Sequence, residues 1–177
     1  TLSRIDSGHQ PTVLNPIDLR KFVADIVEEV RLADHEAHHF EFETRGQTEP
    51  FVTDPLQLRQ ILSNLLSNAA RYSPKGTPVT VGLELAADGC TLEVADRGIG
   101  VPPTDLQRIF EPFERGSNVG GIKGTGLGLN IVLRMTQLLG GTIVASPRPG
   151  GGSVFTVRLP RPADAPKHPQ PTRRGRR

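Results

Sequence analysis

The stretch that decides the fold is residues 54–73, DPLQLRQILSNLLSNAARYS. Asp54 and Pro55 are typical of a helix N-cap and first helical position, and Gln57 completes a capping-box pattern. Apolar residues then return every three or four positions. The sequence SPKG at 73–76 contains the proline and glycine that end helices. We therefore predict a helix from Asp54 to about Tyr72.

One face of this predicted helix is polar. Gln60, Asn64, Asn68 and Tyr72 follow one another at steps of four residues, so they share a face. Asparagine lowers helix stability, and its amide oxygen suits an Mg²⁺ ion that phosphates already hold. A solvated polar face is the other interpretation, and the helix alone does not decide between the two.

Further elements flank this helix on both sides. Asn15 and Pro16 are suited to begin a helix from about 16 to 34. Phe40 and Phe42 alternate with glutamates, which is typical of a strand. The other predicted elements are an extended piece at 51–52, strands at 79–85 and 92–94 joined through Asp88-Gly89, a short helix near 104–110, a helix at 127–139, and strands at 142–146 and 153–159.

This order of elements predicts an α+β fold. The three longer helices would cover one face of a mixed, mainly antiparallel sheet, which gives a two-layer α/β sandwich. The order of the strands does not follow from the pattern.

Charge is unevenly distributed along the chain. Its 177 residues have a net charge of +2, but residues 160–177 carry +5 and the rest −3. The tail is rich in proline and arginine, so we expect it to be disordered, and we expect no nucleic-acid partner. We predict one domain at 11–159. Leu2 and Ile5 at helical spacing indicate the remnant of a helix and a linker at 1–10.

Composition excludes several classes of protein. Cys90 is the single cysteine, which excludes an internal disulfide framework and a cysteine-rich zinc site. The apolar runs are too short for a transmembrane helix, and the first residues do not have the pattern of a signal peptide. His35, His38 and His39 follow the first predicted helix, and we interpret them as an exposed polar turn rather than a metal site.

Asp96-Arg97-Gly98-Ile99-Gly100 follows the strand that ends near Val94. A carboxylate at the end of a strand accepts a hydrogen bond from an exocyclic amine such as that of adenine. The two glycines allow backbone to approach a ligand closely. In isolation the motif is also compatible with an ordinary turn.

A second glycine motif, Gly124-Thr125-Gly126-Leu127-Gly128-Leu129, leads into a predicted helix. Unpaired N–H groups at a helix N-terminus suit phosphate. The spacing matches neither a P-loop nor a dinucleotide fingerprint. Phe110-Glu111-Pro112-Phe113 and a polar, glycine-rich run at 117–123 precede it, which indicates either a lid between aromatic anchors or a surface loop.

Along the chain, the asparagine helix and the motifs at residues 96–100, 110–113 and 124–129 resemble, in this order, the N, G1, F and G2 boxes of sensor histidine kinases. The resemblance covers about residues 16–159. It implies the Bergerat ATP-binding fold, which is shared with gyrase and heat-shock chaperone ATPases, and it implies ATP and Mg²⁺ as cofactors.

The resemblance also implies a role for each matching residue. Asn68 would bind Mg²⁺, Asn64 would face the γ-phosphate, and Arg71 would contact phosphate. Tyr72 would pack on adenine, and Asp96 would accept from its amino group. Phe110 and Phe113 would anchor the lid. These two residues would also contact the cofactor, together with Gly98, Gly100, Gly124, Thr125, Gly126, Leu127 and Gly128. A cation of the lid, Lys123 or Arg115, would reach the γ-phosphate. The implied catalytic residues are Asn64, Arg71 and Lys123.

Asn64 distinguishes transfer from hydrolysis. ATPases that resemble this fold carry a glutamate one turn before the Mg²⁺ asparagine, and an amide cannot replace it as a general base. Transfer to a histidine is therefore expected, although a non-catalytic nucleotide sensor, a serine kinase and a hydrolysing relative remain alternatives. Asn64→Ala should nearly abolish phosphotransfer while nucleotide binding survives.

The implied acceptor histidine is not found in this sequence. His9, His35, His38, His39 and His168 all lack the setting of the family's phosphoacceptor. We expect the acceptor on upstream dimerisation helices, so this chain should bind ATP without autophosphorylating. The expected partners are those helices, in a homodimer, and the receiver domain of a response regulator. We expect a cytoplasmic domain of a membrane-anchored kinase.

Overall fold

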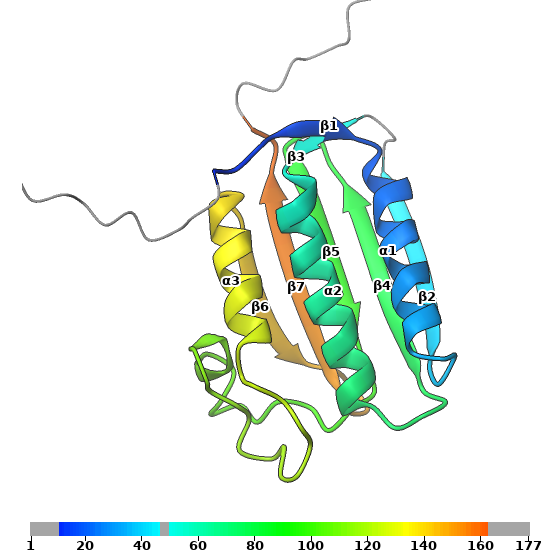
Figure 1. The fold of residues 1–177 in the computed structure, drawn as a ribbon, viewed down its shortest axis with the longest axis vertical. Coiled ribbons are helices and arrows are strands. Elements are labelled where there is room, and N and C mark those ends of the chain that lie inside the picture. The colour runs from blue at the N-terminus through cyan, green and yellow to red at the C-terminus, as the bar shows by residue number, and fades with distance from the viewer. Residues whose placement is uncertain (1–10, 47–49, 163–177) are drawn as a thin grey trace, which may run out of the picture.

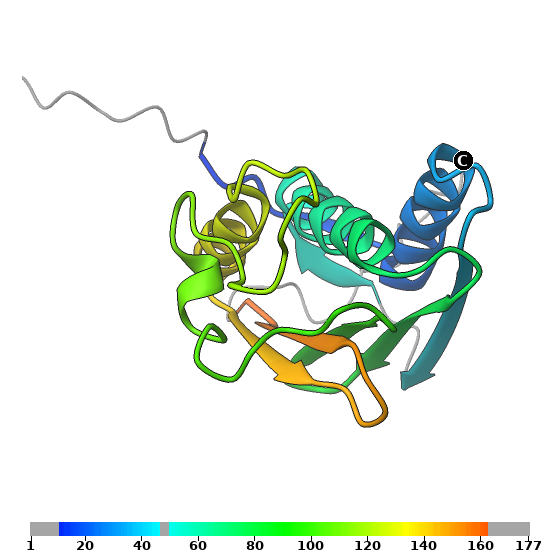
Figure 2. The ribbon, with the colours of Figure 1, turned by 90° about the horizontal axis from the view of Figure 1, so that it is seen from below.

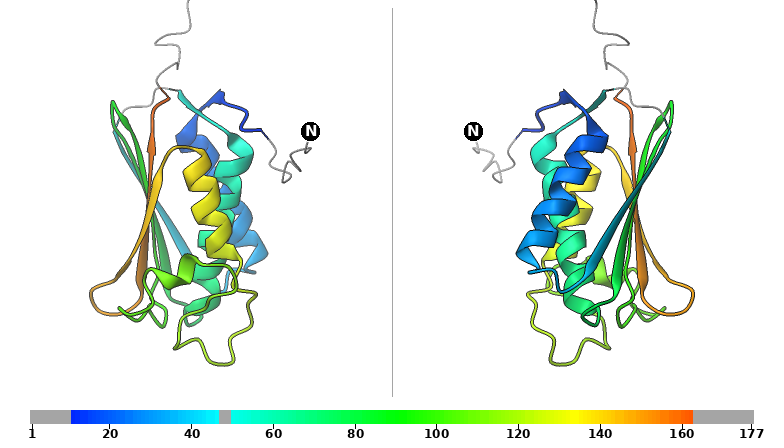
Figure 3. Two further views of the ribbon diagram at one scale, coloured as in Figure 1. Left: turned by 90° about the vertical axis from the view of Figure 1, so that its left-hand side faces the viewer. Right: turned by 90° about the vertical axis from the view of Figure 1, so that its right-hand side faces the viewer.

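A computed structural model describes residues 11–46 and 50–162 of the chain. Three helices, α1 (Leu19–Ala33), α2 (Pro55–Tyr72) and α3 (Gly128–Leu138), lie side by side on one face of a sheet (Figure 1; Figure 3). The predicted two-layer α+β sandwich is confirmed. None of the helices in the described ranges is long and apolar enough to cross a membrane.

The main sheet has five strands in the order β2-β4-β5-β7-β6. The strands are β2 (His39–Gly46), β4 (Pro78–Leu85), β5 (Gly89–Ala95), β6 (Thr142–Pro147) and β7 (Ser153–Pro160). β2 pairs with β4 in parallel, and the other pairs are antiparallel. The sheet is therefore mixed and mainly antiparallel, and both predicted hairpins are present.

The predicted start of the first helix is wrong. Asn15 and Pro16 belong to β1 (Asn15–Ile17), which pairs antiparallel with β3 (Phe51–Thr53) in a separate two-stranded sheet. A residue before proline prefers extended backbone, which suits this pairing. The helix begins at Leu19, and Asp18 is the N-cap, accepting from the Lys21 amide at 3.0 Å.

The core lies between the helices and the sheet. Leu58, Ile61, Leu62, Leu65 and Leu66 form the buried stripe of α2, and alternate residues of β4 and β5 face them. The Asp54 cap is confirmed, since its carboxylate accepts from the amides of Leu56 and Gln57. Because this stripe faces the sheet, the neighbouring polar face of α2 turns toward α3 and the loops.

Several segments meet at one end of the sandwich (Figure 2). The end of α2, the loop after β5, the turn between β6 and β7 and the start of α3 all lie there. The predicted short helix near 104–110 is turns and a short 3₁₀ segment, η1 (Arg108–Phe110). At the other end, Pro160 closes β7 and the Arg161 guanidinium lies over the Phe51 ring at 5.4 Å. The predicted helix remnant at 1–10 and most of the predicted tail, residues 163–177, lie outside the described residues.

Candidate functional site

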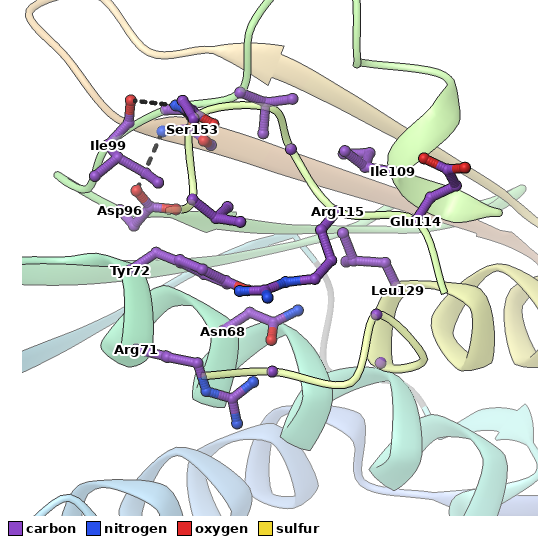
Figure 4. Close-up of a pocket in the computed structure, with 18 of the residues that line it drawn as sticks. Asn68, Arg71, Tyr72, Asp96, Ile99, Ile109, Glu114, Arg115, Leu129 and Ser153 are labelled. Carbon is purple, nitrogen blue, oxygen red and sulfur yellow. Dashed lines mark hydrogen bonds between the residues drawn. The ribbon is translucent and has the colours of Figure 1, made fainter. Parts of the chain in front are cut away.

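A cavity of about 750 Å³, counted to its open mouth, lies at this end of the sandwich. The last turn of α2 forms one wall with Asn68, Arg71 and Tyr72, and Asp96 from the end of β5 lies deeper (Figure 4). The loop that carries Arg115 and the start of α3 form the opposite wall (Figure 4).

Asp96 is an almost completely buried carboxylate with a fixed orientation. Its Oδ1 accepts from the amides of Gly98 at 2.8 Å and Ser153 at 3.2 Å. Burial raises the pKa of Asp96, and the two amides and Arg148 oppose this increase only in part. Both of these hydrogen bonds end on Oδ1, so Oδ2 is the oxygen available to a donor in the cavity.

Close backbone packing joins the loop after β5 to the end of α2. A Cβ on Gly98 would lie 2.4 Å from the Tyr72 carbonyl oxygen, so only glycine fits there. The Ile99 amide donates to the same carbonyl at 3.2 Å. This packing holds Asp96 and Tyr72 close together in the lining of one pocket.

Arg115 crosses the cavity. Its side chain extends between Tyr72 and Asn68 (Figure 4), and Nη2 donates to the Ile122 carbonyl. Its buried Nε finds no partner among the described residues. Together with Arg71, whose Nη1 would lie 3.6 Å from a Cβ on Gly124, it places positive charge beside the glycine motif. An anionic ligand is therefore favoured at this end of the cavity.

The Phe-Glu-Pro-Phe motif and the second glycine motif, which flank the lid, pack against each other. The Phe113 amide donates to the Gly126 carbonyl at 3.1 Å, and a Cβ on Gly126 would lie 2.8 Å from the Phe113 carbonyl carbon. Gly126 also has a left-handed backbone, with φ of 73°, which favours glycine. The glycine motif then leads directly into α3 at Gly128. A buried acceptor, cations and a glycine-rich helix start thus share one cavity.

A model of the histidine kinase-, DNA gyrase B-, and HSP90-like ATPase family matches residues 53–163. The chain belongs to this family. The match begins one residue before the Asp54 cap of α2 and extends past the end of β7. It therefore includes every segment that lines the cavity.

Curated relatives of this ATPase domain are sensor histidine kinases. SenX3 of Mycobacterium tuberculosis, a sensor-like histidine kinase, is 34% identical over 164 residues, which cover 90% of this chain and 39% of SenX3. The sensor histidine kinase RcsC of Escherichia coli is 41% identical over 111 residues, which cover 60% of this chain and 11% of RcsC. The chain thus spans well under half the length of these relatives.

Solved structures agree with this family. The mycobacterial sensor histidine kinase MprB matches with a TM-score of 0.72 and 28% identity, covering 84% of this chain and 98% of that chain. Full-length ShkA in complex with AMPPNP matches with a TM-score of 0.75 and 27% identity, covering 92% of this chain and 34% of that chain. The chain is an ATP-binding catalytic domain of the sensor histidine kinase type.

The cavity of this ATPase domain includes many of the predicted residues. Those that line it are Asn68, Arg71, Tyr72, Asp96, Gly100, Gly124, Thr125, Gly126 and Gly128. Gly98 and Leu127 do not line the cavity, but each is next in the sequence to a residue that does. Asn64 lies one turn before Asn68 and contacts the start of α3: its Oδ1 would lie 3.0 Å from a Cβ on Gly128, and its Nδ2 donates to the Gln60 carbonyl.

Three predicted lid residues lie away from the lining. Phe110 is buried and meets Phe155 edge to face, with ring centroids 6.5 Å apart. Phe113 is 75% exposed and has a left-handed backbone, so its ring is not packed on the core. Lys123 is exposed, whereas Arg115, the other cation considered, lines the cavity.

Sequence reasoning missed part of the cavity wall. Apolar residues from four segments contribute, namely Ile99, Val101, Ile109, Leu129 and Phe155, and Ser153 contributes the amide that fixes Asp96. In a sequence these residues have the same pattern as core residues. The pairing of β7 with β5 is what brings Ser153 and Phe155 into the site.

The predicted exposed turn of histidines is wrong at one position. His38 is buried: its Nδ1 lies 3.0 Å from an Asp34 oxygen and its Nε2 3.2 Å from the Ser73 carbonyl oxygen. No group of three His, Cys, Asp or Glu side chains that could hold a metal ion occurs in the described ranges.

Proposed function

We propose that this domain transfers the γ-phosphoryl group of ATP to a histidine on the dimerisation helices of a sensor kinase. The phosphoryl group then passes to an aspartate of a response regulator. The proposal includes a homodimeric whole protein anchored in a membrane, with this domain in the cytoplasm. It rests on the family, on the names of the relatives and on the chemistry of the cavity.

The deep end of the cavity fits adenine. Oδ2 of Asp96 can accept from the adenine amino group, because Oδ1 is already held by two amides. Ile99, Val101 and Ile109 provide apolar surface for the flat base, and Tyr72 lies opposite Asp96. A purine with a carbonyl oxygen in place of the amino group would bring two acceptors together, so the site should favour adenine over guanine.

The open end fits a triphosphate with its metal ion. Arg71, Arg115 and the backbone N–H groups of the glycine motif supply positive charge and donors. Asn68 is the residue that would hold Mg²⁺, through its amide oxygen. Since one neutral oxygen binds Mg²⁺ weakly, most ligands would come from the phosphates. The ion supplies charge neutralisation at the transferring group.

The observation that carries the proposal is the absence of a general base beside Asn68. Among the described residues that line the cavity, the carboxylates are those of Asp96 and Glu114. Asp96 is held by two amides, and Glu114 pairs with Arg108 at 2.7 Å. Asn64 occupies the position one turn before Asn68, and an amide cannot accept a proton from water. Such a site favours transfer to a positioned histidine over hydrolysis.

The test combines this domain, radiolabelled ATP and Mg²⁺ with separately prepared dimerisation helices of the same protein. The expected product is an alkali-stable, acid-labile label on those helices. Asn68→Ala should remove the label, whereas Gln60→Ala, an exposed residue on the same helix, should retain it. Nucleotide binding without any transfer would favour a sensing module, and release of free phosphate alone would favour an ATPase.

A further inference from the structure

Two consecutive residues of the lid, Ser117 and Asn118, donate hydrogen bonds to the segment 99–105, and Gly116 lies directly before them beside Pro102. We call these three residues the lid root. The lid root separates Arg115, which crosses the cavity, from Val119, which also lines it. Its position therefore determines where both side chains enter the cavity.

The strongest of these attachments is to Asp105. The Asp105 residue is 5% exposed, and its Oδ2 accepts from the Ser117 amide at 2.7 Å and from the Ser117 hydroxyl at 2.8 Å. The two Ser117 donors hold the pKa of Asp105 below its usual value, so the carboxylate is ionised at neutral pH. Two charge-assisted hydrogen bonds from one residue fix both its backbone and its side chain.

The neighbours of Ser117 are attached as well. Nδ2 of Asn118 donates to the carbonyls of Ile99 at 3.3 Å and Gly100 at 3.0 Å, just beyond Asp96 in the chain. A Cβ on Gly116 would lie 2.9 Å from the Asn118 amide oxygen and 4.0 Å from Pro102 Cδ. The lid root is thus attached to the same loop that forms the deep end of the cavity.

The lid beyond its root is open. A Cβ on Gly120 or on Gly121 would meet no atom within 4 Å. The contacts of the lid are therefore concentrated at the lid root and at Ile122, whose carbonyl accepts from Arg115. Asp105 itself does not line the cavity.

We propose that Asp105 is a positioning residue of the nucleotide site, which holds Ser117 so that Arg115 is directed toward the phosphates. The inference rests on the proposed function, because it requires a triphosphate in the cavity. Loss of the attachment frees the lid root, and Arg115 then spends less time across the cavity. The triphosphate loses a cation, while adenine keeps its contacts at Asp96.

The experiment compares Asp105→Asn, Ser117→Ala and Ser117→Thr with the unchanged chain. In Asp105→Asn the amide oxygen can accept from Ser117 only as a neutral acceptor, so the attachment loses its charge assistance and is weakened. Ser117→Ala removes one of the two hydrogen bonds, whereas Ser117→Thr retains both. Asp88→Asn, at an exposed turn on the opposite end of the sandwich, is the matched control.

Three quantities are measured for each variant: the dissociation constants of ATP and of adenosine, the hydrogen exchange rate of residues 116–119, and the unfolding temperature. Asp105→Asn should weaken ATP binding about fivefold or more and adenosine binding less than about twofold, since ATP loses a cation that adenosine does not need. Exchange should accelerate in the lid root. Ser117→Ala should show a smaller effect, and Ser117→Thr and Asp88→Asn should behave like the unchanged chain.

Equal weakening of ATP and adenosine, or no change of either in Asp105→Asn and Ser117→Ala, would overturn the inference. If Asp105→Asn does not fold, the contrast between Ser117→Ala and Ser117→Thr decides in its place. If the unsubstituted chain does not bind ATP, the proposed function is refuted instead. Failure of the inference and failure of the proposed function are therefore distinguishable.

Discussion

The backbone amide of Ser153 donates to the Asp96 carboxylate at 3.2 Å across a separation of 57 residues. The antiparallel pairing of β5 with β7 brings the two residues together, since Ala95 lies opposite Val154. The Asp96 amide in turn donates to the Ser153 carbonyl at 2.9 Å. Sheet pairing thus continues into the site and orients the carboxylate that we propose as the acceptor for the adenine amino group.

The pH dependence of adenosine binding tests the role of Asp96. Because burial raises the pKa of Asp96, and because an amino donor favours the ionised carboxylate, adenosine affinity should fall as pH drops through that raised pKa. Adenosine avoids the titration of phosphates. Titration calorimetry at several pH values measures the effect, and the decline should begin above the ordinary pKa range of aspartate.

Linkage predicts the sign of the effect of Asp96 on stability. A raised pKa in the folded state means that protonation stabilises the fold. This contribution is present at low pH and is lost as pH rises through the raised pKa. Asp96→Asn should therefore remove that part of the pH dependence of unfolding.

Asp96→Asn should also reverse the preference of the site for adenosine over inosine, which has a carbonyl in place of the amino group. Asp88→Asn should leave this preference unchanged.

We expect Arg115 and Lys123 to contribute differently to triphosphate binding. Arg115 lines the cavity and crosses it, whereas Lys123 is exposed outside the lining. Arg115→Ala should weaken ATP binding about 10- to 100-fold, and Lys123→Ala less than about threefold, as measured by calorimetry. A larger loss in Lys123→Ala would show that the lid moves Lys123 onto the phosphates when nucleotide binds.

Asn64 should affect transfer more than binding. It contacts the start of α3 and does not line the cavity, so Asn64→Ala should leave the ATP dissociation constant within about threefold. Phosphotransfer to the dimerisation helices should be nearly abolished. Ser67→Ala, an exposed neighbour, is the control. Unchanged transfer in Asn64→Ala would refute a role for this side chain in the reaction.

His38 contributes to stability at the end of α2. Its two ring nitrogens face the Asp34 carboxylate and the Ser73 carbonyl, which follows Tyr72 directly. His38→Ala should lower the free energy of unfolding by about 1–3 kcal/mol, because it removes the buried imidazole that faces Asp34 and the Ser73 carbonyl. His39→Ala, at an exposed position, should change it by less than about 0.5 kcal/mol in urea unfolding. Equal effects in the two variants would contradict this role.

Much of the fold could be predicted because local signals were strong. Asp54 and Pro55 mark the start of α2, and Asp88-Gly89 marks the β4–β5 hairpin. The start of α1 was wrong because Asn15 and Pro16 suit both a helix start and extended backbone, and only the distant partner β3 decides between them. Strand order depends on pairing between distant segments, which the pattern does not contain.

The residues of the candidate site divide in the same way, into those with a local sequence signal and those whose position depends on contacts between distant segments. Asn68, Asp96 and the glycine motif could be predicted to line one site because their order along the chain resembles the boxes of a known family, although each motif alone was ambiguous. Ser153 and Ile109 could not, because the first acts through its backbone and the second has the pattern of a core residue. The burial of His38 also depends on tertiary packing, against Ser73 at the end of α2.

The most direct test of the account is a crystal structure of this domain with Mg²⁺ and AMPPNP. The account predicts adenine in the deep end of the cavity, with its amino group within hydrogen-bond distance of Asp96 Oδ2. It also predicts Mg²⁺ bound to the amide oxygen of Asn68 and Arg115 directed toward the phosphates. A nucleotide bound elsewhere, or one in this cavity with its base turned away from Asp96, would contradict it.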